Sequence, residues 1–413
     1  MRAPVAGAGV YCGSPGQRKA TCSPPVRTGG LKMKAFIFLV AGAALVGCAS
    51  APSAGNVNSL FADARFTAPS EPVSGGDIFA LDGPMRSYLT HQIAGYVRNH
   101  GPRRGLLYAL RDDFRIEYDA DRTRNAEQAF ASRSGNCLSL AIMTGAFAKQ
   151  MGIPVTYREV YGFDSWSRSD GLTFHSGHVN LVLGPLPPDG WEHIRANPPL
   201  IVDFLPPQEA AAMTAREIPE QMIVAMYLNN RAAEIMAGGD VDRAYWWARA
   251  AIRADPSFLG AYNTLGVIYA RHGDLSEAEQ ALRYALTREP ESVDVLSNLI
   301  QLFEAESRTA EAQVLKKRLA GIEPYPPFYF FDRGKAAMAK GDYRSAVELF
   351  RKELARLPYN DEVHFALAVA ELRLGNLGGA RGQLELALDN STSGQRHAIY
   401  AAKLEHLKAL SVN

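Results

Sequence analysis

The residue with the clearest chemical potential is Cys137, which lies in the stretch SRSGNCLSLAIMTGAFAKQMGIP, residues 132–154. Two later stretches carry His178 and Asp203. A thiol is a poor nucleophile until it loses its proton, which a neighbouring imidazole can take and later return to a leaving group. A carboxylate on the other ring nitrogen fixes the tautomer of that imidazole. These residues therefore predict a triad for acyl transfer or hydrolysis, with Cys137 as nucleophile, His178 as base and Asp203 as its orienting group.

Cys137 is predicted to open a helix, because an apolar stripe follows it at helical spacing. The stripe comprises Leu138, Ile142, Phe147 and Met151. The unpaired N–H groups and the dipole at a helix start stabilise a thiolate, and the N–H of Cys137 is placed to help stabilise an oxyanion. Gly135 permits the tight entry into the helix that such a cysteine needs.

The other two members of the triad lie on predicted strands. Residues 155–163, 177–184 and 199–206 alternate in polarity as strands do. Adjacent strands can hold His178 and Asp203 within hydrogen-bond reach although they are far apart along the chain. His175 lies three residues before His178 and is the second candidate for the base. Its strand parity places it on the opposite face of the sheet, so it ranks lower.

These stretches resemble the transglutaminase-like superfamily of papain-like cysteine enzymes. The resemblance rests on SGNCLSLAIMTGAFAKQMGIP, SGHVNLVL and LIVDFLP, which run from Ser134 to Pro206. It implies an α+β papain-like domain in which Cys137 is the nucleophile, His178 the base and Asp203 its orienter. One departure concerns substrate positioning: the family commonly has His-Ala-Trp, whereas Val179 and Asn180 follow the histidine here.

Each candidate residue also has an alternative interpretation. A single cysteine is often a small buried hydrophobic residue, a lone strand histidine is often a satisfied polar residue, and Asp203 alone would suit a turn. A zinc site formed by Cys137 with His175, His178 or His193 is disfavoured, because structural zinc usually has four ligands with close pairs such as CxxC. We therefore expect no metal and no other cofactor.

The N-terminus has the pattern of a lipoprotein signal. Met33 and Lys34 precede an apolar run, residues 35–47, that is too short to span a membrane. The sequence LVGC at its end resembles the lipobox of bacterial lipoproteins, in which the cysteine, here Cys48, is diacylated and becomes the first mature residue. We interpret residues 1–32 as an over-long start, with Met33 as the true one. Six of the 44 Lys and Arg residues and none of the 43 acidic residues precede Cys48, so the mature chain would be mildly acidic.

The C-terminal half repeats with a period of 34 residues. Alanine, proline and glycine each recur at this offset, with Ser307 in the one gap of the glycine series. The recurrent positions are Ala244, Ala278, Ala312, Ala346 and Ala380; Pro256, Pro290, Pro324 and Pro358; and Gly239, Gly273, Gly341 and Gly375. The unit from Tyr262 to Pro290 resembles the tetratricopeptide repeat. Five units, beginning near 225, 259, 293, 327 and 361, predict an all-α solenoid, with the aromatic residues 328–331 packed between helices.

The sequence therefore predicts a leader and lipoprotein signal (1–47), a flexible tether (48–77), an α+β transglutaminase-like domain (78–215) and an all-α tetratricopeptide-repeat solenoid (216–413). Three functions compete: a membrane-tethered hydrolase of peptide or isopeptide bonds, an acyl transferase that uses an amine acceptor, and a non-catalytic interaction scaffold.

We expect two kinds of partner. The solenoid should bind a protein or peptide, and lipidated Cys48 should bind a membrane. The near-zero net charge gives no indication of nucleic-acid binding. The expected location is the bacterial cell envelope, on the outer membrane facing the periplasm.

Overall fold

The computed structural model of this chain describes residues 10–11, 57–70, 72–120, 122–169, 172–185, 200–204 and 214–410. The predicted signal segment, Met33 and Cys48 lie outside the described residues, and so does His193. The predictions made for the leader and the lipid anchor therefore remain predictions.

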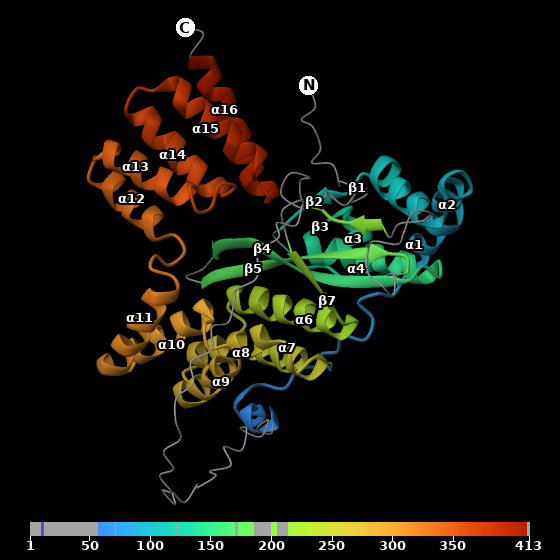
Figure 1. Cartoon of the computed structure of the whole chain (residues 1–413), viewed down its shortest axis with the longest axis horizontal. Helices are drawn as coiled ribbons and strands as arrows, with labels where there is room; N and C mark the ends of the chain where they lie inside the picture. The colour runs from blue at the N-terminus through green and yellow to red at the C-terminus, as the bar shows by residue number, and fades with distance from the viewer. Residues whose placement is uncertain are drawn as a thin grey trace, which may run out of the picture.

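An antiparallel sheet forms the centre of the N-terminal half (Figure 1). Its strand order is β1 (Val10–Tyr11), β6 (Leu200–Val202), β5 (Leu172–Leu183), β4 (Val155–Ser169) and β7 (Thr214–Ile218). Strands β4, β5 and β6 fall where the alternating sequence predicted strands, although β4 and β5 extend further into one long hairpin. β7 pairs with β4 up to Ile218, so the sheet continues a few residues past the predicted boundary at 215/216.

Helices cover this sheet and lead into the site. The first half contains α1 (Gly83–Tyr88), α2 (Ala94–Tyr108), α3 (Ala126–Ser132) and α4 (Cys137–Gln150), with π-helical turns at Leu89–Ile93 and Ala109–Phe114. Two short strands, β2 (Glu117–Tyr118) and β3 (Ser134–Gly135), pair in parallel immediately before α4. The helix start at Cys137 agrees with the sequence prediction. α4 is buried from Leu138 to Ala148, as its apolar composition requires.

Five helix pairs and a final helix form the C-terminal half, as the repeat period predicted. The pairs are α6 (Glu220–Ala237) and α7 (Val241–Ala254), α8 (Leu259–His272) and α9 (Leu275–Arg288), α10 (Val293–Ala305) and α11 (Thr309–Ile322), α12 (Tyr329–Ala339) and α13 (Tyr343–Leu354), and α14 (Asp361–Arg373) and α15 (Leu377–Asp389), followed by α16 (Gly394–Leu410).

The recurrent residues have distinct physical roles in this solenoid. All five recurrent alanines are buried, which lets paired helices approach closely. The turns between the paired helices need a left-handed residue, and glycine supplies it in four of them. In the third repeat Ser307 adopts that conformation itself, with φ 59°. Phe328 and Phe331 are buried between helices, as predicted for this aromatic segment, and the buried Glu353 accepts hydrogen bonds from their backbone N–H groups.

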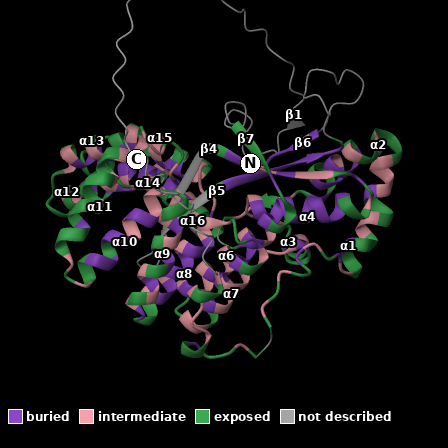
Figure 2. Cartoon of the chain, turned by 60° about the horizontal axis from the view of Figure 1, so that its bottom comes forward, coloured by how far each residue is buried: buried purple, intermediate pink, exposed green. Residues whose placement is uncertain are grey.

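The sheet domain and the first three repeats share one hydrophobic core (Figure 2). The cluster runs from Phe66 to Ala312 and includes α4, β5 and α6 to α11. The later repeats curve back toward the β4–β5 hairpin (Figure 1), where the Trp166 carbonyl accepts a hydrogen bond from Asn360 at 3.4 Å. The solenoid is therefore packed against the domain that carries the candidate triad.

The segment predicted as a flexible tether differs from that prediction. Residues 57–70 form two 3-10 turns, Val57–Leu60 and Asp63–Arg65, and lie against the first two repeats. The small and Pro/Gly-rich composition suggested a linker. In the structure, however, the Phe66 ring stacks on Tyr245 and the Arg249 guanidinium lies over the Phe61 ring. Burial of these rings offsets the entropy lost on ordering the chain.

Candidate active site

The start of α4 is held by a network of short polar contacts. The Asn136 side chain caps the helix, because its Oδ1 accepts from the Ser139 N–H at 2.9 Å and from the Ser139 hydroxyl at 2.7 Å. The Asn136 amide in turn donates to Thr123 at 3.0 Å. A Cβ on Gly135 would lie 2.7 Å from the Ser139 Cβ, so only glycine fits beside the cap. These contacts place Cys137 at the first helical position, where the helix dipole favours a thiolate.

His178 on β5 and Asp203, the residue directly after β6, form a buried pair. The two side chains are 1% and 2% exposed, and His178 Nε2 lies 2.7 Å from Asp203 Oδ1. β5 and β6 pair through Leu181 and Val202, which brings the two residues to one face of the sheet. The carboxylate fixes the orientation of the ring and favours its protonated form.

The third contact joins His178 to the thiol. The Cys137 side chain is hydrogen-bonded to the His178 ring, whose Nε2 is engaged by Asp203. The structure therefore brings together all three residues of the predicted triad.

The protonation equilibria of the pair favour charge separation. Burial alone would raise the pKa of the Cys137 thiol, but the hydrogen bond and charge of His178 lower it below its ordinary value. The N–H groups of Val179 and Leu138 also lower that pKa. Burial alone would lower the pKa of His178, but its hydrogen bonds to Asp203 and Cys137 raise it to about 10. A thiolate–imidazolium pair is the form that these shifts favour at neutral pH.

Asn180 is a member of the site that the sequence interpretation missed. It is 4% exposed, and its amide donates to Asp203 Oδ2 at 2.7 Å, so both carboxylate oxygens have partners. Arg158 on β4 donates to the Asn180 Oδ1 at 3.0 Å and thereby fixes the orientation of the amide. Asn180 occupies the place of the aromatic residue in the family pattern, and that departure was the available signal.

Tyr118 also reaches the thiol and had no sequence signal. Pairing of β2 with β3 sets Tyr118 opposite Gly135, just before Cys137. Its hydroxyl interacts with both the thiol and the backbone N–H of Cys137. Burial, together with the neighbouring thiol, raises the pKa of this phenol. The N–H predicted to stabilise an oxyanion is therefore engaged by Tyr118, and a substrate oxygen that uses it has to replace that hydroxyl.

His175 lies away from the triad, as its strand parity predicted. Its ring stacks on Trp166 with centroids 4.3 Å apart, and its Nδ1 lies 2.8 Å from the Asp294 carboxylate on α10. It contacts the solenoid, so the structure favours His178 as the base.

The part of the chain described contains no cluster of three or more His, Cys, Asp or Glu residues able to hold a metal. Within the same residues, no helix combines the length and apolarity needed to cross a membrane.

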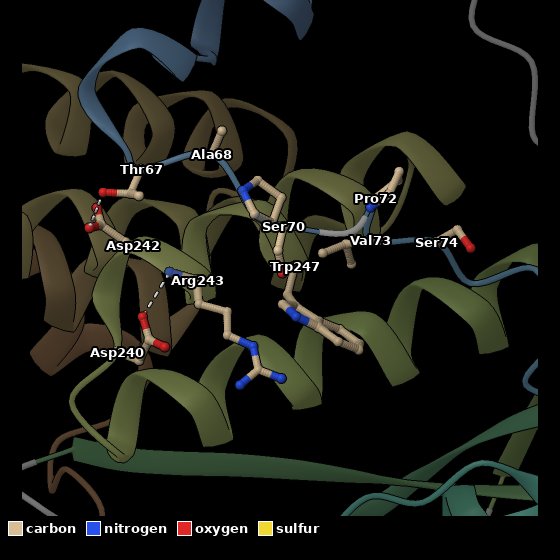
Figure 3. A pocket seen from close by; sticks show the side chains of 11 residues that line it. Thr67, Ala68, Ser70, Pro72, Val73, Ser74, Asp240, Asp242, Arg243 and Trp247 are labelled. Carbon is tan, nitrogen blue, oxygen red and sulfur yellow. Dashed lines mark hydrogen bonds between the residues drawn. The ribbon is translucent and has the colours of Figure 1, made fainter.

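A cavity of about 570 Å³ lies elsewhere, beside the ordered N-terminal segment (Figure 3). Residues 67–70 and 72–74 form one wall, and Asp240, Asp242, Arg243 and Trp247 form the other. None of the lining residues belongs to the triad, so this cavity is separate from the candidate active site.

Comparison with known proteins defines the class of the C-terminal half. Residues 236–293, 263–320 and 331–394 match the family model of the tetratricopeptide repeat. This part of the chain is therefore a tetratricopeptide-repeat solenoid, and such repeats generally bind protein or peptide partners.

Particular relatives share limited parts of the chain. It is similar to cellulose synthase operon protein C of Pseudomonas fluorescens (strain SBW25), with 29% identity over 160 residues. That match covers 37% of this chain and 12% of the relative, so the chain spans a small fraction of the relative's length. Among solved structures, it is similar to PilF of Pseudomonas aeruginosa, with 18% identity, coverage of 46% of this chain and 94% of that one, and a TM-score of 0.27. A thermophilic repeat protein of Thermus thermophilus shows 20% identity, coverage of 44% and 98%, and a TM-score of 0.29.

Proposed function

We propose that this protein is a cysteine-dependent hydrolase of peptide or isopeptide bonds, built on a transglutaminase-like domain, whose repeat solenoid binds a protein partner or substrate. The observation that carries the proposal is the chain of hydrogen bonds from the Cys137 thiol through His178 to the buried Asp203 carboxylate. The shared core of the sheet domain and the first repeats also supports it, because a partner on the solenoid is held near this site.

The chemistry follows from the arrangement of the three groups. The Cys137 thiolate attacks the carbonyl carbon of an amide, a C–S bond forms, and the carbonyl electron pair moves to oxygen. The Cys137 N–H, released from Tyr118, donates to that oxyanion. His178 then gives its proton to the leaving nitrogen as the C–N bond breaks, which leaves an acyl-thioester and a free amine. His178, now neutral, takes a proton from water as the water oxygen attacks the thioester carbonyl. The C–S bond then breaks, which releases the carboxylic acid and restores the thiolate–imidazolium pair.

An amine in place of water at the last step would make the protein an acyl transferase. Both reactions share the acyl-thioester on Cys137, and they differ only in the acceptor that reaches it. Incubation of the protein with a peptide substrate and a labelled primary amine separates them, since incorporation of the label requires aminolysis.

A non-catalytic scaffold is the second candidate, and the match of the solenoid to the tetratricopeptide repeat favours it. Under this proposal the Cys137 domain serves as a docking surface, and its thiol takes no part in function. Cys137→Ala removes only the sulfur atom of this residue. The variant should lose function if the protein is a hydrolase and keep function if the protein is a scaffold.

The deciding experiment is a proteomic comparison of envelope proteins in four strains, which carry wild-type protein, Cys137→Ala, His175→Gln or a deletion of the gene. A hydrolase predicts that the same uncleaved proteins accumulate in Cys137→Ala and in a deletion strain. His175→Gln is the matched control, because His175 lies on β5 like His178 but is outside the triad. Normal function and an unchanged proteome in Cys137→Ala would refute the catalytic proposal and leave the scaffold.

We further propose that diacylated Cys48 anchors the protein to the outer membrane on its periplasmic side. The support is the LVGC sequence after a short apolar run, followed by Ala49 and not by an aspartate that would suggest inner-membrane retention. Several acyl chains together give stable anchoring, which one chain does not. Cys48→Ser should release the protein into the soluble fraction and remove the mass of the lipid; unchanged mass and membrane association would contradict the anchor.

A further inference from the structure

The ordered N-terminal segment, Leu60–Thr67, is held through its backbone by side chains of the solenoid. The Tyr269 hydroxyl donates to the Leu60 carbonyl at 2.7 Å and accepts from the Ala62 N–H at 3.0 Å. The Trp246 indole donates to the Thr67 carbonyl at 2.7 Å. Hydrogen bonds to the main chain of a bound segment are one source of affinity in peptide-binding sites.

The side chain of Asp63 occupies a polar subsite on the surface formed by α7 and the α8–α9 turn. One of its carboxylate oxygens accepts from the Tyr245 hydroxyl at 2.6 Å and the other from the Arg249 guanidinium at 2.8 Å. Both oxygens are thus bound by donors of the first repeat, and charge-assisted hydrogen bonds of this kind are the stronger ones.

Two neighbouring subsites accept a base and an aromatic ring. The Arg65 guanidinium lies 2.5 Å from each of the Asp274 and Glu277 carboxylates. Phe66 is 5% exposed, and its ring stacks on Tyr245 with centroids 4.0 Å apart. The surface therefore distinguishes an acid, a base and an aromatic residue at fixed positions of a short sequence.

The segment has little structure of its own. It consists of one-turn 3-10 helices, and its long-range bonds go to residues of the repeats. Single turns are unstable in isolation, so contacts with the solenoid supply its order. The cavity lined by residues 67–70 and 72–74 begins directly after the docked Phe66 and leaves room for a different continuation of the chain (Figure 3).

We infer that this surface of the first two repeats is a peptide-binding site for the sequence acid-x-base-aromatic, with the chain's own Asp63–Phe66 as resident ligand. A partner peptide with the same chemistry binds there when it displaces that segment. Because a tethered ligand has an effective concentration of about a millimolar, the site is largely closed to a free peptide until the resident segment leaves it. This inference is independent of the chemistry at Cys137.

The test uses the full chain and a fluorescein-labelled peptide of residues 57–70. Fluorescence anisotropy is measured with wild type and with the double variant Asp63→Ala and Phe66→Ala, which weakens the resident segment and leaves the surface intact. We expect the peptide to bind the double variant at least tenfold more tightly than wild type. A peptide in which Phe66 is alanine should lose this binding.

The surface itself is tested by adding Tyr245→Phe and Tyr269→Phe to the double variant. These changes keep both buried rings and remove only the two hydroxyls that contact the segment. Peptide binding should fall at least tenfold. No binding to a double variant whose circular dichroism matches wild type, or equal binding with and without the hydroxyls, would overturn the inference.

Hydrogen exchange of the unmodified chain supplies a second measurement if the double variant fails to fold. A separable ligand predicts that the amide of Ala62 exchanges faster than those within α7 and α8, through local release of the segment. Exchange of Ala62 only together with those helices would show that the segment is an inseparable part of the core, and the inference would be wrong.

Discussion

Replacement of His178 by glutamine is expected to remove most of the reactivity of the Cys137 thiol at mildly acidic pH. The hydrogen bond and charge of His178 act against burial to lower the pKa of this thiol. Glutamine retains an amide that can donate to Asp203 but carries no charge. The variant should therefore keep its fold and lose the hydrogen bond and charge of His178 that favour the thiolate.

The size of the effect follows from the ionisation of a thiol. A thiol with an ordinary pKa of about 8.5 is ionised to only about 0.3% at pH 6, so a fully formed thiolate is about 300-fold more abundant. The helix start and the N–H groups of Val179 and Leu138 remain in the variant and keep part of the stabilisation. We therefore expect the alkylation rate at pH 6 to fall by between about tenfold and about 300-fold.

The effect has a defined dependence on pH. A lowered pKa means that the Cys137 thiolate is present above that pKa and is lost as the pH falls through it. The difference between wild type and variant should shrink toward pH 8.5, where an ordinary thiol also ionises. The pKa of His178 is raised to about 10, so the imidazolium is present below that pH and turnover should decline above it as the general acid is lost.

The assay is the rate of carbamidomethylation of the peptide containing Cys137, followed by mass spectrometry after short exposures to iodoacetamide. Counting the label on that peptide alone avoids interference from the other three cysteines. His175→Gln serves as control and should react like wild type. Equal rates for His178→Gln and wild type at pH 6 would refute the assignment of His178 as the group that activates the thiol.

Four further predictions concern the site and the solenoid. Asp203→Asn should lower turnover less than His178→Ala, because the carboxylate orients the base and takes no proton; comparing kcat/KM of the two variants checks this. Asn180→Ala should cost about 2 kcal/mol in urea unfolding and slow alkylation at pH 6, because one buried carboxylate oxygen of Asp203 loses its donor. Ser307→Gly should raise the free energy of unfolding by about 1 kcal/mol, because glycine adopts φ 59° without a Cβ penalty. Residues 216–413 alone should give a helical circular dichroism spectrum, as five repeats exceed the roughly three needed for stability; a strand-rich or unfolded spectrum would contradict this.

The solenoid was predictable because the residues that specify its helices and turns recur at a fixed period in the sequence. Small residues recur where helices cross, glycine recurs where the turn needs a left-handed residue, and proline follows four of the five helix pairs. Even Ser307, the one exception in the glycine series, adopts the conformation that its position demands. A repeat contacts mainly its neighbours, so the pattern of one unit specifies the packing of the next.

The candidate site was predictable in part. Cys137, His178 and Asp203 were named from a helix start and two strands, and the structure places them in one hydrogen-bonded chain. Asn180 differs in the sequence only as a departure from the pattern of the family that the chain resembles, because its role depends on the register between β5 and β6. Tyr118 left no signal, since a two-residue strand pair brings it to the thiol.

The sequence by itself determined the repeat architecture, the helix that begins at Cys137 and the strands that carry His178 and Asp203, because periodicity and composition are local properties of a chain. Only the tertiary structure decided that Asn180 and Tyr118 join the site and that the segment predicted as a flexible tether docks on the first repeats. Those features depend on strand register and on contacts between residues far apart in sequence, whose energies arise only when the folded surfaces meet. A short segment such as Asp63–Phe66 looks like a linker until the surface that binds it has formed.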